Sequence, residues 1–126
     1  MATIDFYVCE KCGNVIVKLQ DSGCVPVCCG EEMKKVEPNT TDAAQEKHVP
    51  VIKKNGLDVV VQVGSVMHPM AEDHYITFIA VAYGSRVEYI RLKPGDDPAA
   101  EFTLVDDQPV TAYEYCNKHG LWMSTY

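Results

Sequence analysis

The sequence lacks the features that define several large classes of protein. Its 126 residues contain no apolar run near the roughly 20 residues that a membrane-spanning helix needs. Lysine and arginine form no cluster, and the net charge is −7, so we expect neither nucleic acid nor membrane as a partner. The first residues show no basic region followed by an apolar stretch, so we expect no secretion signal and a cytoplasmic location.

Cysteine and histidine, in contrast, are frequent and unevenly distributed. Five of the six cysteines fall in the first 29 residues, and the sixth, Cys116, stands alone near the end. All four histidines follow residue 47. In a secreted miniprotein the cysteine cluster would indicate disulfides, but in a cytosolic chain it indicates metal binding. Two kinds of metal ligand therefore occupy two segments of the chain.

The hydrophobic pattern predicts two domains, at residues 1–36 and 37–126. The first has short apolar pieces broken by glycine, which fit two or three short strands. A segment of this size buries too little surface to be stable alone and needs a metal or disulfides. Residues 37–45 lose the pattern and are predicted to be a linker at the start of the second domain.

From His48 onward the pattern is typical of β-strands. The Asn55-Gly56 pair between two apolar runs is a strong hairpin signal, and residues 75–83 are apolar on both faces, as in a central strand. Five or six short strands with frequent turns predict a mainly β protein whose larger domain is a β-sandwich. The expected strands cover residues 49–52, 57–63, 75–83, 87–92, 101–105 and 110–115.

Four of the early cysteines have the spacing of a tetrahedral metal site. Cys9 and Cys12 share one tight turn, and Cys28 and Cys29 follow after 15 intervening residues. Because adjacent strand residues point to opposite faces, we expect the backbone to bend at the second pair. A zinc-only structural site and a disulfide or redox pair remain alternatives. Cys24 is left over and is expected to pack in the interior.

The histidines occupy predicted strand ends and loops, where binding residues collect. His119 also belongs to a Cys-x-x-His pair with Cys116. Imidazole and thiolate together are a donor set that iron accepts. The histidines are His48, His68, His74 and His119.

Together these motifs resemble the desulfoferrodoxin family, the two-iron superoxide reductases, over the whole chain. They are Cys9-x-x-Cys12 with Cys28-Cys29, Glu46-Lys47-His48-Val49-Pro50, His68-Pro69-Met70 followed by His74, and Cys116-Asn117-x-His119-Gly120. The resemblance implies a desulforedoxin-like domain followed by an immunoglobulin-like β-sandwich. The implied ligands of the first iron are Cys9, Cys12, Cys28 and Cys29, and those of the second are His48, His68, His74, His119 and, axially, Cys116.

The resemblance also implies an activity, the one-electron reduction of superoxide to hydrogen peroxide at a non-haem iron with an open sixth position. Lys47 would steer superoxide and hydrogen-bond the product, and Glu46 would occupy the sixth position in the ferric state. The implied role is superoxide detoxification with electron transport, and the implied partners are a rubredoxin-like electron donor and a second copy of the chain. A superoxide dismutase and a non-catalytic iron electron-transfer protein remain alternatives.

Overall fold

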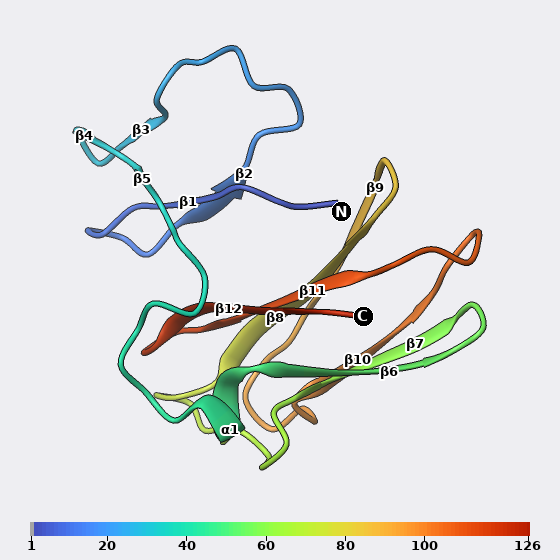
Figure 1. The fold of residues 1–126 in the computed structure, drawn as a ribbon. Coiled ribbons are helices and arrows are strands. Elements are labelled where there is room, and N and C mark those ends of the chain that lie inside the picture. Colours follow the sequence, from blue (N-terminus) through green and yellow to red (C-terminus); the bar gives the residue numbers. More distant parts are fainter. Residues whose placement is uncertain (1) are drawn as a thin grey trace. The chain divides into compact units, whose positions relative to one another are not determined.

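The computed structural model describes residues 2–126, and most of them lie in short β-strands (Figure 1). The predicted mainly β fold is confirmed. The chain divides into two compact units, Ile4–Glu37 and Pro38–Tyr126, the second together with the residues up to Thr3. Within residues 2–126, no helix has the length and apolarity needed to cross a bilayer.

The small unit contains a three-stranded sheet and a separate two-stranded hairpin. The sheet has the order β2-β1-β5, and strands β3 and β4 form the hairpin, with all pairs antiparallel. The strands are β1 (Phe6–Val8), β2 (Val15–Val17), β3 (Val27–Cys28), β4 (Glu31–Glu32) and β5 (Lys34–Lys35). The buried hydrophobic side chains among residues 4–37 are Ile4, Phe6, Cys9 and Met33. So small a core fits the expectation that a metal stabilises this unit.

The large unit consists of two antiparallel sheets and one short helix (Figure 1). One sheet has the order β10-β7-β6, and the other has the order β12-β11-β8-β9. The elements are α1 (Gln45–His48), β6 (Pro50–Asn55), β7 (Asp58–Val63), β8 (Ile76–Tyr83), β9 (Arg86–Arg91), β10 (Ala99–Thr103), β11 (Thr111–Cys116) and β12 (Gly120–Thr125).

The core of the large unit lies between the inner faces of the two sheets. Val59, Val61 and Val63 alternate along β7 and are almost fully buried. They pack in one cluster with residues of β8, including Ile79 and Val81. The intervening Ala80 and Ala82 of β8 are also buried, which confirms the prediction of a central strand.

Some predicted boundaries were wrong. The hairpin turn is Gly56-Leu57, one residue later than expected, because Asn55 pairs with Asp58. Strand β10 begins two residues earlier than predicted, because Ala99 pairs with Gln62. Strand β12 was not predicted at all. Its consecutive Leu121 and Trp122 are both buried, so its sequence lacks the period-two alternation that marks a strand.

The antiparallel topology brings three connecting segments to the same end of the sandwich. These are helix α1 before β6, the loop 64–75 between β7 and β8, and the turn 117–119 between β11 and β12. All four histidines lie on these three segments, and Cys116 is the last residue of β11. The fold therefore assembles the predicted ligands from distant parts of the sequence.

Candidate metal centres

The four imidazole rings of the large unit meet edge to face in a closed cycle. The order around the cycle is His48, His68, His74 and His119, with ring centroids 4.7 to 5.1 Å apart and interplanar angles of 74° to 88°. With the Cys116 sulfur, one donor atom from each residue lies within 4.8 Å of all the others. The structure therefore brings together all five residues that the sequence predicted for this site.

Two backbone carbonyls determine which nitrogen of two imidazoles faces the centre of this histidine ring. His48 Nδ1 donates to the carbonyl of Ala44, and His68 Nδ1 donates to the carbonyl of Pro69, both at 2.7 Å. The Nε2 atoms of these two histidines are therefore left without a proton, as a metal ligand must be. Of the other two, His74 has a buried Nε2 that has no hydrogen-bond partner in residues 2–126, and His119 presents Nδ1.

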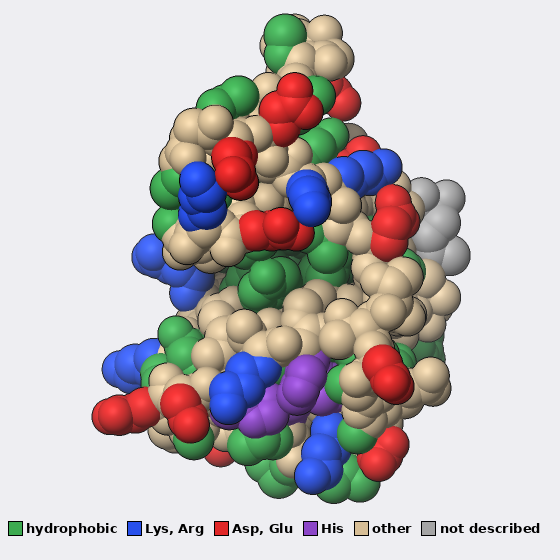
Figure 2. Space-filling model, turned by 90° about the vertical axis from the view of Figure 1, so that its left-hand side faces the viewer, with side chains coloured by type: hydrophobic (Ala, Val, Ile, Leu, Met, Phe, Trp, Pro, Cys, Tyr) green, Lys and Arg blue, Asp and Glu red, His purple; other side chains and the backbone are tan. Residues whose placement is uncertain are grey.

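Three of the four imidazoles are held neutral. Burial lowers the pKa of His48, of His74 and of His68, the last to about 4. His48 and His68 are almost fully buried, whereas His74 and His119 are partly exposed. Figure 2 shows histidine side chains reaching the surface, with lysine or arginine side chains beside them. A small molecule in solution can therefore approach the histidine ring.

The distances between nitrogens fit a square arrangement around a metal ion. Two nitrogens at right angles, each bonded at about 2.1 Å, lie about 3.0 Å apart. His48 Nε2 lies 3.0 Å from His119 Nδ1 and 3.2 Å from His68 Nε2. Four imidazoles and one thiolate are a donor set that iron accepts. The residues thus fit an iron site.

The sulfur of Cys116 is buried at the end of β11. Burial raises the pKa of its thiol, and hydrogen bonds from the backbone amides of Lys118 and His119 act in the opposite direction. The two amides point at the sulfur because the chain turns sharply between β11 and β12. They would stabilise a thiolate and moderate the electron density that it gives to a metal.

Two residues that the sequence analysis did not place in the site contact the histidines or the segments that carry them. The Trp122 ring stacks on His48 at 4.9 Å between centroids, and its Nε1 donates to the His119 carbonyl at 3.1 Å. The Asn117 side chain accepts from the Tyr75 amide at 2.9 Å and donates to the Asp73 carbonyl at 3.0 Å. These two bonds hold the residues on either side of His74. The position of Asn117 inside the Cys-x-x-His segment was the sequence signal that could have identified this role.

Glu114 is the unexpected residue of this region. It is fully buried, and its carboxylate oxygens have no hydrogen-bond partner in residues 2–126. Burial raises its pKa to about 9, so it is protonated in the folded protein at neutral pH. It lies two residues before Cys116 on β11.

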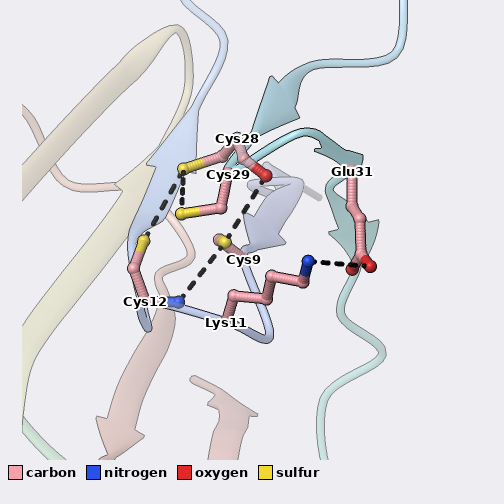
Figure 3. A network of polar contacts seen from close by, with 6 residues as sticks. All are labelled: Cys9, Lys11, Cys12, Cys28, Cys29 and Glu31. Atoms are coloured by element: carbon pink, nitrogen blue, oxygen red, sulfur yellow. Dashed lines mark hydrogen bonds and ion pairs between the residues drawn. The ribbon is translucent and has the colours of Figure 1, made fainter.

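The second candidate centre lies in the small unit, where four cysteine sulfurs point toward one another (Figure 3). The sulfurs of Cys12 and Cys28 are 3.6 Å apart, and those of Cys28 and Cys29 are 4.0 Å apart. All are free thiols. Four sulfurs bonded at about 2.3 Å to a tetrahedral metal would lie about 3.8 Å from one another. The set therefore fits a tetrahedral ion.

A tight hairpin turn explains how the adjacent Cys28 and Cys29 share one site. Cys28 pairs with Glu31, so the loop is Cys29-Gly30, and these residues have φ of 53° and 76°. Two positive φ values are typical of a type I′ turn, which strongly favours glycine. The turn supplies the backbone bend that the sequence required.

The protonation of the cysteines is uneven. A hydrogen bond from the Cys12 amide lowers the pKa of Cys9 to about 7, so this thiolate forms more readily than those of Cys28 and Cys29. Hydrogen bonding with Cys12 raises the pKa of Cys28 to about 12. Cys24 lies outside the cluster and is exposed, so the expectation that it packs in the interior was wrong. The loop before β3 places it at the surface, and its carbonyl accepts from Lys18.

Fold and donor sets together define the class: a mainly β non-haem iron protein with two iron sites, one of four cysteines and one of four histidines and a cysteine. A family model described as Desulfoferrodoxin matches residues 40–125. The chain is 51% identical to a desulfoferrodoxin homolog of Archaeoglobus fulgidus over 118 residues, covering 94% of both chains.

Two further comparisons extend over nearly the whole chain. A desulfoferrodoxin of Nitratidesulfovibrio vulgaris is 49% identical over 119 residues, covering 94% of this chain and 93% of that one. The crystal structure of the superoxide reductase from Treponema pallidum superimposes with a TM-score of 0.80 at 33% identity, covering 97% and 98% of the two chains. The chain belongs to the desulfoferrodoxin family, with a desulforedoxin-like metal domain followed by an immunoglobulin-like β-sandwich.

Proposed function

We propose that this protein is a superoxide reductase. One superoxide anion, one electron and two protons give one molecule of hydrogen peroxide. Iron in the ferrous state would supply the electron at the histidine ring. The observation that carries the proposal is the closed ring of four imidazoles with the buried Cys116 sulfur, partly open to solvent, in a chain of the desulfoferrodoxin family.

The geometry supports a specific set of proposed ligands. His48, His68 and His74 would bind through Nε2, His119 through Nδ1 and Cys116 through its sulfur. A divalent cation with one thiolate and four neutral imidazoles carries a net charge of +1, which attracts an anion even in an acidic protein. The proposed ligands of the second iron are Cys9, Cys12, Cys28 and Cys29.

Lys47 and Glu46 are the proposed catalytic residues of the chain. Both are exposed on α1 directly before the ligand His48. The Lys47 ammonium would raise the local concentration of superoxide and, through water, donate a proton to the reduced product. The Glu46 carboxylate would close the open position in the oxidised state and keep other anions out.

The partners and location are part of the same proposal. A rubredoxin-like protein would return the electron, which gives the chain its role in electron transport, and the chain would act in the cytoplasm as a homodimer. The open edges of the sheet in the small unit, at β2 and β5, support self-association, and six free thiols fit a reducing compartment. Light scattering on the purified protein tests the dimer, and a mass of 14.0 kDa would refute it.

The central test measures stoichiometry and the role of Lys47 together. The reduced protein is mixed anaerobically with a pulse of superoxide, and peroxide and oxygen are quantified. A reductase consumes one electron for each peroxide and releases no oxygen, whereas a dismutase releases oxygen. Lys47→Ala should lower the second-order rate constant about tenfold with unchanged iron content, because one attractive charge is lost. Lys53→Ala, on the exposed side of β6, is the matched control and should react at the wild-type rate.

A further inference from the structure

Helix α1, which carries Glu46 and Lys47, cannot maintain its own position. It has four residues, its N-cap residue Ala44 provides no side-chain cap, and one turn of helix is unstable in isolation. Its backbone contacts include Lys47 N to Ala44 O at 3.2 Å and Val49 N to Gln45 O at 2.9 Å. Something outside α1 must therefore determine where the Glu46-Lys47 peptide lies.

That support comes from residues 64–66, the turn that follows β7. The Glu46 carbonyl accepts from the Val66 amide at 2.9 Å and from Ser65 Oγ at 3.3 Å. The turn is braced in its own right, because Gln62 Nε2 donates to the Gly64 carbonyl at 3.0 Å. It then leads directly to His68, whose amide donates to the Val63 carbonyl at 3.0 Å. The turn thus links the backbones beside two proposed ligands.

Gly64 is the point of closest approach between this turn and α1. A Cβ at Gly64 would lie 2.6 Å from the Glu46 carbonyl oxygen and 3.0 Å from the Lys47 carbonyl carbon. Both are backbone atoms, so no side-chain rotation can relieve the contact. Gly64 is buried and its φ is not positive, so the requirement for glycine here is one of space. A methyl group would push the Glu46-Lys47 peptide away by several tenths of an ångström.

We propose that Gly64 is a positioning residue for superoxide reduction, because the Glu46-Lys47 peptide packs directly against its backbone. The inference builds on the proposed function, since it takes Lys47 as the group that attracts superoxide. Gly64 itself makes no contact with the reactant. Its part is to let the backbone approach closely enough for the Val66 amide to hold the Glu46 carbonyl, and so to fix the point from which the Lys47 side chain extends.

A double-mutant cycle tests this proposal on the iron-loaded protein. Gly64→Ala should lower the second-order rate constant with superoxide severalfold, and Gly64→Ala combined with Lys47→Ala should be no slower than Lys47→Ala alone. Additive losses would overturn the proposal, because Gly64 would then act through something other than Lys47. A wild-type rate for Gly64→Ala or for Lys47→Ala would overturn it too. Ser85→Ala, in the exposed turn after β8, is the control.

A second measurement does not depend on activity. Hydrogen exchange of the segment around Val66, followed by mass spectrometry, reports whether its amide still donates to the Glu46 carbonyl. Gly64→Ala should raise the exchange rate of that amide about tenfold through loss of one hydrogen bond. An unchanged exchange rate would refute the proposal that Gly64 allows the Val66 amide to hold the Glu46 carbonyl.

A further variant tests the proposal if Gly64→Ala fails to fold or to bind iron. Gln62→Ala with Ser65→Ala removes both side-chain braces and adds no bulk. It should react about twofold to threefold more slowly than wild type, again without effect in the Lys47→Ala background. A wild-type rate would refute the positioning role. If the wild-type protein itself fails to reduce superoxide, the proposed function fails, whereas a fast wild type with unaffected variants refutes the Gly64 inference alone.

Discussion

Replacing Asn39 should reveal how strongly one exposed side chain secures strand β12. Asn39 imitates a neighbouring strand: its Oδ1 accepts from the Met123 amide at 2.8 Å and its Nδ2 donates to the Met123 carbonyl at 3.1 Å. Its own amide donates to the Leu121 carbonyl at 3.0 Å. Asn39 has φ of 62°, a left-handed conformation that asparagine tolerates better than alanine.

The expected loss of stability has two parts. Two hydrogen bonds at an exposed position contribute about 0.5 kcal/mol each, the low end of the usual range. Holding alanine in the left-handed region costs about 1 kcal/mol. Asn39→Ala should therefore lower the free energy of unfolding by about 2 kcal/mol. Glycine accepts the left-handed region, so Asn39→Gly should be about 1 kcal/mol more stable than Asn39→Ala.

Urea unfolding followed by the fluorescence of Trp122, the single tryptophan, measures both variants. Trp122 is almost fully buried on β12, so its emission reports on the strand that Asn39 pairs with. Asp42→Ala, at an exposed position three residues further on, is the control and should stay within about 0.5 kcal/mol of wild type. A variant Asn39→Ala as stable as wild type would show that the Asn39 pairing adds nothing to the folded state.

Three further outcomes are expected. The folded-state pKa of Glu114, about 9, lies above the ordinary 4.5, so the unfolded chain releases a proton that the folded one keeps. Stability should therefore fall by up to about 1.4 kcal/mol per pH unit from pH 5.5 to 8.5 relative to Glu114→Gln, and parallel curves would contradict this. Cys28→Ser should remove one metal per chain and its thiolate absorption while the metal at the histidine ring remains, as elemental analysis and spectra can show. Trp122→Phe, which frees the His119 carbonyl, should lower thermal stability by about 2 kcal/mol and shift the absorption of the histidine-bound metal, whereas an unchanged spectrum would argue against support by Trp122.

Much of the fold and of the candidate site was predictable because their signals are local. Period-two alternation marks β7, and the Cys-x-x-Cys and Cys-x-x-His spacings indicate which residues can share an ion. The structure brings those nine residues into two groups, as the motifs predicted. Their roles as ligands, like those of Glu46 and Lys47, stay a prediction.

The rest depends on contacts that no local pattern contains. Strand β12 was not predicted because its buried Leu121 and Trp122 are consecutive and break the period-two alternation of a strand. The stacking of Trp122 on His48 joins residues that are distant in the sequence. The fit of Gly64 against Glu46 is a matter of tenths of an ångström between backbones. Properties of this kind arise only when the sheets have come together.

The different spread of the two donor sets along the chain has a consequence for biogenesis. The four cysteines lie within 21 residues, from Cys9 to Cys29, so closing their loop costs little entropy and they can capture an ion early. The histidine ring extends from His48 to His119, and His119 is placed by the pairing of β11 with β12. We therefore expect maturation in sequence, with the cysteine centre filled on a partly folded chain and the histidine centre filled only after the sandwich closes.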